Sequence, residues 1–415
     1  MHTTIKTLIV KRFRSLPSAR IDLDNPTFLV GRNGSGKSNL VDVFAFLSEA
    51  MSLPLRAVFD RRGGIAAVRN KTSGKSFPPN LGLAMVFGAL DGTATTGRYA
   101  FEVKALPDYG FEVDREQCLI RARDGGREWF ERQGKKFSSS AEGLRPRIEP
   151  SALALPVVGG HAGFAPVLRA LSALRVYSIE PSKLREMQDP DSGVSLKPDG
   201  SNAGSVLKEI ERQSPEDAAR ICEILASIVP NTKSVHAKKH GNKLSLEFTQ
   251  EWEQVSHSRI NVSLREPKTG SQTRTLRFEA FSMSDGTLRA LGLLAAVFQR
   301  PSPALLAIEE PEATIHPGAL GAVLDLLKGA TKRMQVVITT HSPEVLDQKW
   351  IRDSQIRVVD WSEGATRVAA LSEASRRAIQ EHLMGAGELL RSNALDPQPL
   401  FDEEISQAEL FERVE

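Results

Sequence analysis

The sequence predicts an α/β fold in which a mixed sheet is flanked by helices, with an antiparallel subdomain and an α+β insertion lobe. Three apolar runs, 27–30, 305–309 and 335–340, have the length and composition of buried strands, and helical patterns follow the first two. Strand and helix patterns that alternate in this way favour a parallel core. Residues 81–122 instead hold short β-prone runs separated by turn-forming residues, which is typical of an antiparallel sheet.

Composition places few limits on function. A chain of 415 residues with 40% hydrophobic and 25% charged residues is long enough for two or three globular domains. The net charge is 54 − 51 = +3, so any nucleic-acid contact must come from local basic patches. No apolar run reaches the ~18 residues of a membrane span, and the N-terminus lacks a signal-peptide core. We therefore expect a cytoplasmic protein with no membrane contact and with Cys118 and Cys222 as free thiols.

The first 137 residues are predicted to begin the main domain. Residues 5–13 and 21–23 have strand patterns, and residues 39–47 carry apolar side chains at helical spacing. Residues 51–77 contain two adjacent glycines and no clear period, which predicts a helix end followed by a loop. The β-prone runs of the antiparallel subdomain are 81–90, 99–103, 110–113 and 118–122.

Residues 138–275 are predicted to form the insertion lobe, and residues 276–395 to complete the main domain before an acidic tail, 396–415. The lobe begins with a polar linker that contains two prolines. A helix is predicted at 215–228, with Ser214 as its N-cap. The other elements predicted for the lobe are a helix at 167–174, a strand at 176–179, a loop at 189–201, a helix at 205–212, and strands at 243–248 and 260–264.

A glycine-rich stretch between the strand 27–30 and the helix that follows fits the P-loop pattern G-x-x-x-x-G-K-[ST]. Glycines allow backbone amides to face phosphate oxygens, and the helix N-terminus adds a partial positive charge beneath them. Lys37 can reach the β- and γ-phosphates, and the Ser38 hydroxyl can bind Mg²⁺. The predicted nucleotide-binding residues are Gly31, Arg32, Asn33, Gly34, Ser35, Gly36, Lys37, Ser38 and Asn39.

Two further strand ends carry polar residues suited to phosphate chemistry. The apolar strand 305–308 ends in Glu309 and Glu310, a Walker B pattern, in which Glu309 would hold Mg²⁺ directly or through water. Glu310 would orient or deprotonate the attacking water. The strand 335–340 ends in His341, where it would face the ligand crevice of an α/β sheet.

Two other segments are candidates for nucleotide contact. The turn Ser284, Asp285, Gly286 and Thr287 opens the helix 288–298, and free amides at a helix N-terminus bind anions. Because the turn is close in sequence to the Walker B strand, we expect it to face a second molecule rather than its own P-loop. Arg12 and Arg14 flank Phe13 after the first strand; contact with the nucleotide and simple solvation both remain open for them.

These motifs, in this order, resemble the ATP-binding-cassette (ABC) ATPases of the RecF/SMC class. The chain also resembles the compact bacterial AAA-type group related to the overcoming-lysogenization-defect proteins, through Lys11-Arg12-Phe13-Arg14-Ser15-Leu16 and Asp199-Gly200-Ser201-Asn202. The resemblance implies an ABC-type head that uses ATP and Mg²⁺ and pairs as a homodimer or a larger homo-oligomer around two ATP molecules. It implies a signature motif acting in trans at 284–287, a catalytic glutamate at Glu310 and a switch histidine at His341.

The resemblance also covers residues 311–317, including Glu312 and His316, which would communicate across the dimer. Three departures stand out. Glu309 replaces the aspartate common in these ATPases, and Asp285 stands where many cassettes have glycine. No glutamine-loop residue is evident, and both Gln117 and Gln133 remain open.

Three biological roles are compatible with such an ATPase. The first is an ATP-gated dimer that binds duplex DNA in repair or anti-phage defence. The second is a regulatory or sensor ATPase that controls a toxin or an effector nuclease encoded nearby, with the acidic tail as a docking segment. A nuclease in the same chain is disfavoured, because only about 55 residues follow the last predicted core strand, 356–360. The basic patches that favour DNA are Arg121, Arg123, Arg127, Arg132, Lys135 and Lys136, and Lys233, Lys238, Lys239 and Lys243.

Overall fold

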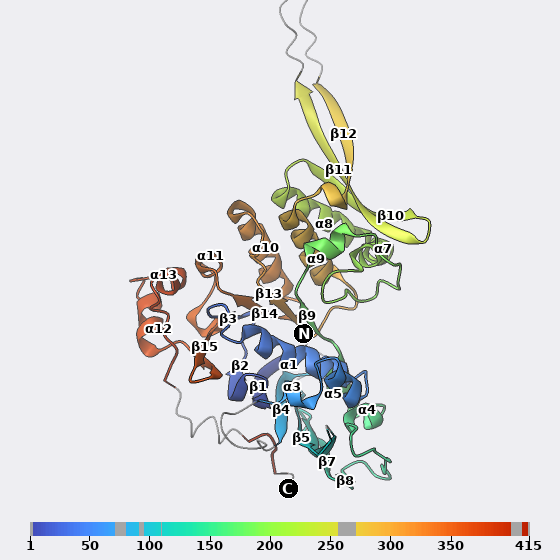
Figure 1. The fold of residues 1–415 in the computed structure, drawn as a ribbon, viewed down its shortest axis with the longest axis vertical. Helices are drawn as coiled ribbons and strands as arrows, with labels where there is room; N and C mark the ends of the chain where they lie inside the picture. The colour runs from blue at the N-terminus through green and yellow to red at the C-terminus, as the bar shows by residue number, and fades with distance from the viewer. Residues whose placement is uncertain are drawn as a thin grey trace, which may run out of the picture. The chain divides into compact units, whose positions relative to one another are not determined.

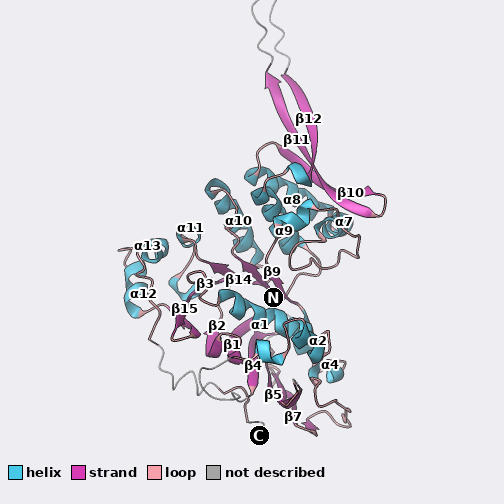
Figure 2. Ribbon diagram, viewed as in Figure 1, coloured by secondary structure: helices cyan, strands magenta, loops and turns pink. Residues whose placement is uncertain are grey.

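A computed structural model describes residues 3–70, 80–90, 95–108, 110–255, 271–399 and 409–413. The chain falls into two compact units, which we describe one at a time. The first comprises residues 1–176, 302–310 and 328–415, and the second comprises residues 177–301 and 311–327. Figure 1 labels the helices and strands, and Figure 2 colours them by type.

The first unit contains a six-stranded sheet whose centre is parallel. Strand β3 lies between β14 and β15 and is parallel to both, and β13 continues the parallel order beyond β14. All residues of β3 and β14 are buried, as expected for strands covered on both faces. Strand β16 runs antiparallel to β15. The strands in sheet order are β16 (Ala365–Ala370), β15 (Ile356–Ser362), β3 (Thr27–Val30), β14 (Gln335–Thr340), β13 (Leu305–Glu309) and β9 (Leu174–Tyr177).

A seven-stranded sheet completes the first unit, and each of its pairings is antiparallel. The long β1 also contributes residues to the common hydrophobic core. The strands in sheet order are β2 (Leu16–Asp22), β1 (Thr4–Phe13), β4 (Leu81–Ala89), β5 (Thr96–Ala105), β6 (Phe111–Arg121), β7 (Arg127–Gln133) and β8 (Lys136–Ser139).

Helix α1 (Lys37–Ala50) joins the two sheets. Its apolar side chains, including Phe44 and Phe46, share one core with residues of both sheets, and Figure 1 shows the helix between them. Burial on this scale holds the first turn of α1 in place at the end of β3. The remaining helices of this unit are α2 (Leu55–Asp60), α3 (Ile65–Val68), α4 (Leu155–Val158), α5 (Ala165–Ser172), α11 (Pro343–Leu346), η2 (Asp353–Gln355), α12 (Glu373–Gln380) and α13 (Ala386–Arg391).

The second unit is a cluster of helices with a three-stranded antiparallel sheet. Strand β11 is central in this sheet, between β10 and β12. Figure 1 shows β11 and β12 continuing as a long ribbon beyond β10. The elements are α6 (Pro181–Arg185), α7 (Ala203–Gln213), α8 (Pro215–Ile228), β10 (Thr232–His240), β11 (Lys243–Val255), β12 (Ser271–Glu279), η1 (Ala280–Ser282), α9 (Asp285–Phe298) and α10 (Pro317–Ala330), whose last turn belongs to the first unit.

The structure differs from the sequence predictions at several elements. Residues 51–70 contain two further helices, α2 and α3, where a helix end and a loop were expected, and residues 111–121 form one strand where two were expected. Strands β7, β8, β10, β12 and β16 were not predicted. The predicted strand 260–264 and part of the loop 51–77 lie outside the described residues.

The two units also divide the chain differently from the predicted domains. Residues 138–176, expected in the insertion lobe, belong to the first unit, and residues 276–301, expected in the main domain, belong to the second. The reason is packing: α5 packs against α1, whereas α9 packs against α6, α7 and α8. Among the described residues, no helix has the length and hydropathy of a membrane span.

Candidate functional site

The predicted P-loop lies in the first unit between β3 and α1. Helix α1 begins at Lys37, and its cap, Gly36, has φ = 99°, which is in the left-handed region that favours glycine. Gly34 also has a positive φ of 79°. The chain can therefore turn sharply from the strand into the helix, and the amides of the first turn remain available to an anion.

Two P-loop glycines are also required by close neighbours. A Cβ atom on Gly31 would lie 2.0 Å from the carbonyl oxygen of Val359 in β15. A Cβ atom on Gly36 would lie 2.0 Å from the Oγ1 atom of Thr366 in β16. Neither position tolerates a side chain without movement of the backbone of β15 or of a buried threonine.

Lys37 and Ser38 connect the P-loop to the acidic end of β13. The Lys37 ammonium donates hydrogen bonds to the carbonyl oxygens of Gly31, at 2.7 Å, and Arg32, at 3.0 Å, and lies 3.9 Å from Glu310 Oε1. The Ser38 hydroxyl donates to Glu309 Oε2 at 2.5 Å. The two motifs, about 270 residues apart in sequence, thus form one site.

Glu310 occupies a strained position next to His341. Its φ is 44°, an uncommon value for a residue other than glycine, and its amide donates to the carbonyl and hydroxyl oxygens of Thr339, each at 3.1 Å. The Nδ1 atom of His341 lies 3.1 Å from Glu310 Oε1. Backbone strain held by neighbouring groups is concentrated at functional sites. The structure therefore brings Lys37, Ser38, Glu309, Glu310 and His341 together.

The oxygen donors at this site suit a magnesium ion. Mg²⁺ prefers one or two protein oxygen ligands together with water and substrate phosphates. Ser38 Oγ and Glu309 Oε2 are adjacent and belong to the two motifs that would hold the ion. A bound Mg²⁺ would neutralise charge on the phosphate oxygens.

The two arginines at the end of β1 have different partners. Arg12 donates to the carbonyl oxygen of Asn80 at 3.0 Å, so the structure does not bring it to the P-loop. Arg14 forms an ion pair of 2.7 Å with Asp42, which lies one turn into α1. Arg62, which the sequence did not single out, also pairs with Asp42 and with Glu49, each at 2.9 Å. Burial opposes the charge of Arg62, but hydrogen bonds to Glu49 and Asp42 outweigh it and raise its pKa.

A hydroxyl network behind the P-loop was also missed by the sequence predictions. Thr366 Oγ1 donates to the carbonyl oxygen of Ser35 at 2.9 Å and lies 2.7 Å from Ser15 Oγ. Asn39 Nδ2 donates to the same Ser15 hydroxyl at 2.7 Å. No sequence motif marks Thr366, which is more than 320 residues from the P-loop and is completely buried.

The predicted trans motif lies in the second unit. Ser284 caps α9, accepting a hydrogen bond from the amide of Thr287 at 3.2 Å, and Asp285 pairs with Arg185 at 2.6 Å. Gly286 packs closely against residues 311–317, since a Cβ atom there would lie 2.6 Å from the carbonyl oxygen of Thr314. The turn is therefore rigid, and the exposed Phe281 precedes it.

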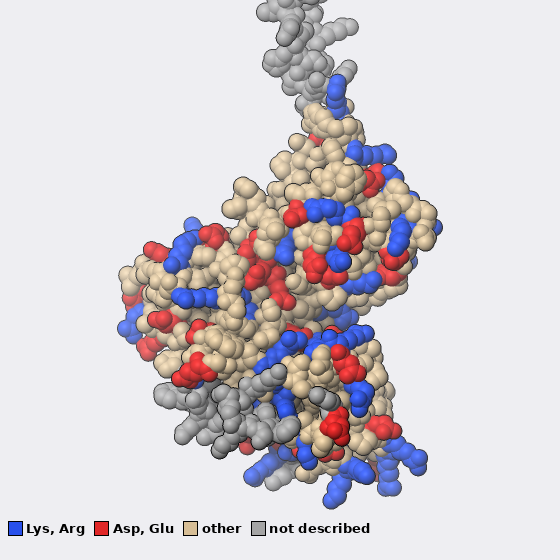
Figure 3. Space-filling view, in the orientation of Figure 1, with Lys and Arg blue, Asp and Glu red and all other residues tan. Residues whose placement is uncertain are grey.

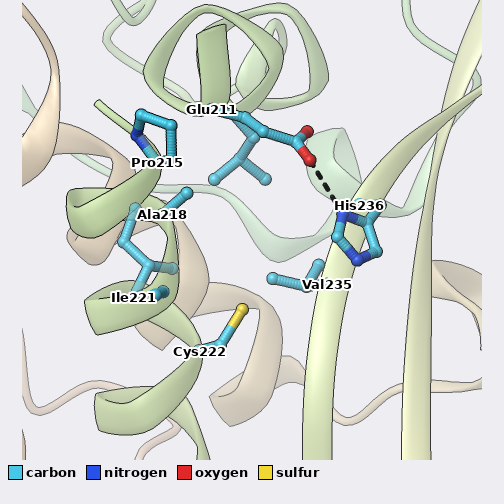
Figure 4. Close-up of a pocket in the computed structure, with 9 residues that line it drawn as sticks. Glu211, Pro215, Ala218, Ile221, Cys222, Val235 and His236 are labelled. Atoms are coloured by element: carbon cyan, nitrogen blue, oxygen red, sulfur yellow. Dashed lines mark ion pairs between the residues drawn. The ribbon is translucent and has the colours of Figure 1, made fainter. Parts of the chain in front are cut away.

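A separate cavity of about 230 Å³ lies in the second unit between α7, α8 and β10 (Figure 4). Its walls are mostly apolar, and Glu211 faces His236 across it, with 3.6 Å between Oε1 and Nδ1. Burial raises the pKa of the Cys222 thiol, which disfavours the reactive thiolate.

The predicted basic patches are only partly available to a ligand. In the first, Arg132 is 2% exposed and donates to the carbonyl oxygens of Gly134 and Glu149, so it was wrongly assigned to the surface. In the second, three lysines form ion pairs, Lys233 with Glu251, Lys238 with Glu247 and Lys243 with Asp189. Figure 3 shows basic and acidic side chains interspersed over α7, α8 and β10.

Comparisons with known proteins agree with the ATPase prediction. Residues 176–347 match a family described as "AAA domain, putative AbiEii toxin, Type IV TA system", and residues 4–78 match the AAA ATPase domain family. Among curated proteins, none has significant sequence similarity to the chain.

Solved structures show the fold. An Smc head bound to the C-terminal winged-helix domain of ScpA has a TM-score of 0.50 and 14% identity over 91% of this chain and 99% of that one. An Smc head with an extended coiled coil, bound to the C-terminal domain of ScpA and derived from Pyrococcus furiosus, has a TM-score of 0.51 and 14% identity over 92% and 99%. The chain is thus similar in sequence to ATPase-domain families over residues 4–78 and 176–347, and its fold resembles that of the Smc heads.

Proposed function

We propose that the chain binds and hydrolyses ATP with Mg²⁺ and that two copies pair around the nucleotide. The observation that carries this proposal is the contact between the two motifs, in which Ser38 Oγ lies 2.5 Å from Glu309 Oε2 while Lys37 and His341 both approach Glu310. A P-loop alone binds nucleotides of many kinds. Hydrolysis also requires acidic residues, here at the end of β13, close to the P-loop.

Each residue has a distinct role in this proposal. Backbone amides of residues 31–38 and the Lys37 ammonium would bind the phosphates, and Ser38 and Glu309 would hold Mg²⁺. Glu310 Oε1 would accept a proton from the attacking water. His341 Nδ1, 3.1 Å from the same oxygen, would hold the carboxylate in position and contact the γ-phosphate.

Pairing of two copies would complete the site. The turn at Ser284 lies at the N-terminus of the 14-residue helix α9, and its amides would bind the γ-phosphate held by a second copy. The similarity of the fold to Smc heads, together with the rigid turn, supports this arrangement.

Hydrolysis and binding should separate in two variants. Glu310→Gln should lower the rate of phosphate release ~10²- to 10⁴-fold, the usual contribution of a general base, and leave the Kd for ATP nearly unchanged. Lys37→Ala should instead raise the Kd for ATP by ~10-fold or more, because a direct phosphate contact is lost. Phosphate release and titration with a fluorescent ATP analogue would measure the two effects.

A matched control is Glu373→Gln, which removes a carboxylate from the exposed surface of α12, where it pairs with Arg377. It should leave both quantities unchanged. Turnover at the normal rate in Glu310→Gln would show that the catalytic assignment is wrong, and an unaltered Kd in Lys37→Ala would refute the P-loop assignment.

For biological role, we favour defence, as an ATP-gated dimer on duplex DNA or as a regulator of a partner effector. The description of the family matched by residues 176–347 supports a toxin or defence context. The ion pairs of Lys233, Lys238 and Lys243 favour the regulator, because paired lysines release fewer counterions on binding DNA. Affinity for duplex DNA that falls steeply with salt would favour the DNA-binding role instead.

A further inference from the structure

The C-terminal segment Glu409–Arg413 lies on the outer face of the seven-stranded sheet in the first unit. Its contacts come from β1, β4, β5 and β6, far from the segment in sequence. The acidic tail was expected to be available to a partner protein, but these five residues are bound to their own chain. The contacts fall into three groups: the backbone, the apolar side chains and the acid.

Two side chains of the sheet recognise the backbone of the segment. Gln117 donates from Nε2 to the carbonyl oxygen of Glu412 at 2.8 Å and accepts from the amide of the same residue at 3.0 Å. Arg98 donates from Nε to the carbonyl oxygen of Leu410 at 3.0 Å and also binds the carbonyl oxygen of Glu409. Gln117 is 1% exposed with the segment in place, so both of its hydrogen bonds to Glu412 are shielded from water.

The sheet also contacts the two apolar side chains of the segment, Leu410 and Phe411. Leu410 is 4% exposed and packs on Ile9, Ala84 and Ala100. Gly82 makes room for it, because a Cβ atom at that position would lie 2.3 Å from Leu410 Cδ1. The guanidinium of Arg115 lies 4.2 Å from the centre of the Phe411 ring, a cation–π contact.

The acid is matched by two arginines. Glu412 forms an ion pair of 3.2 Å with Arg98 and a second ion pair with Arg121. The face thus provides a backbone clamp, a leucine pocket, a cation above an aromatic ring and a pair of cations for a carboxylate. Simple packing of a chain end does not require a buried glutamine that bonds both backbone groups of one residue.

We propose that this face is a peptide-binding site specific for a Leu-Phe-Glu sequence, occupied in cis by the chain's own residues 410–412. A peptide of the same sequence binds there in trans when the tethered segment is weakened. Tethering gives the cis segment a high effective concentration, so the site is largely closed to free peptide in the intact chain. The proposal does not depend on nucleotide binding or hydrolysis.

The test uses the full chain with its own segment disabled by Leu410→Asp and Glu412→Lys. A fluorescein-labelled peptide of residues 407–415 is titrated and followed by anisotropy. We expect a Kd on the order of micromolar for this variant, and binding at least ~10-fold weaker to the unmodified chain, because the tethered segment competes. Adding Gln117→Ala to the variant should weaken binding at least ~10-fold.

Substitutions in the peptide avoid any effect on the fold of the protein. Peptides with Leu410→Ala or Phe411→Ala should bind at least ~10-fold more weakly than the natural peptide, as expected for loss of a buried anchor. In the protein, Lys136→Ala removes an exposed cation on β8 and is the matched control for Gln117→Ala. It should not change the Kd for the natural peptide. The proposal is overturned if the disabled chain does not bind the natural peptide, or if it binds the substituted peptides equally well.

Discussion

At the scale of single residues, the candidate site depends on side chains that no motif contains. Thr366 fixes the P-loop from behind: its hydroxyl binds the carbonyl oxygen of Ser35, and its side chain occupies the space that a Cβ atom on Gly36 would need. The Ser15 hydroxyl links Thr366 to Asn39 on the first turn of α1. A phosphate cradle works only if its amides are held in place before the ligand arrives.

If Thr366 holds the P-loop in position, Thr366→Val should lower the affinity for ATP. The substitution keeps the shape of the side chain and removes one hydroxyl, leaving the Ser35 carbonyl oxygen and the Ser15 hydroxyl short of a partner. A net loss of about 0.5–1.5 kcal/mol per hydrogen bond corresponds to a Kd for ATP that rises ~2- to 10-fold. Thr366→Ser should restore the affinity.

The fluorescent-analogue titration measures the Kd, and thermal melting without nucleotide reports stability separately. Thr331→Val removes a hydroxyl that binds the carbonyl oxygen of Lys328 at the end of α10, and it serves as the control. If Thr366→Val and Thr366→Ser bind ATP with the same affinity, the hydroxyl has no positioning role.

The same residues show what can be predicted from sequence at the site. Lys37, Ser38, Glu309 and Glu310 each follow or precede an apolar run within a short motif, so their placement follows from local patterns. Thr366 and Arg62 lie in segments without a motif and approach the P-loop or α1 only through the fold. Local periodicity has no means of indicating such contacts.

At the scale of elements, two helices of the second unit, α8 and α9, each begin with a serine N-cap and can be compared directly. Ser284 accepts from the amide of Thr287 at the start of α9, and Ser214 accepts from the amide of Asp217 at the start of α8. Both helices have 14 residues. Loss of an N-cap typically costs ~1 kcal/mol.

We therefore expect Ser284→Ala and Ser214→Ala to lower the free energy of unfolding by similar amounts, about 1 kcal/mol each. Only Ser284→Ala should also weaken ATP-dependent pairing, because Ser284 belongs to the proposed trans motif. Denaturant titration gives the first quantity and light scattering with ATP the second. Equal pairing in the two variants would argue that the Ser284 turn does not contact nucleotide in a second copy.

Polar strands account for most of the missed elements. The sequence predicts a break near residues 114–117 because these side chains are polar, yet β6 continues through them. Glu116 is buried and accepts from the Tyr99 hydroxyl at 2.8 Å and the Leu155 amide at 2.9 Å, and Gln117 binds Glu412. Strand β10 is rich in lysine and histidine and exists as a strand through its pairing with β11. In each case tertiary partners override local pattern.

At the scale of the whole molecule, the cis and trans halves of the proposed ATP site lie in different compact units. The P-loop, Glu309, Glu310 and His341 belong to the first unit, and Ser284 with residues 311–317 belongs to the second. Residues 310 and 311 mark the point where the chain passes from one unit to the other. The end of β13 therefore joins Glu310, the proposed catalytic glutamate, directly to residues 311–317, against which Gly286 of the proposed trans motif packs.

This arrangement predicts that ATP controls assembly. In Glu310→Gln, bound ATP persists because hydrolysis is blocked, so light scattering with ATP and Mg²⁺ should show a mass twice that of one chain. Glu310→Gln combined with Lys37→Ala should remain at the lower mass, since it cannot hold the nucleotide. Strengthening of the dimer by short duplex DNA would support a DNA clamp. A mass that does not respond to ATP or DNA would contradict ATP-gated pairing and favour a preformed scaffold whose nucleotide state controls a partner protein.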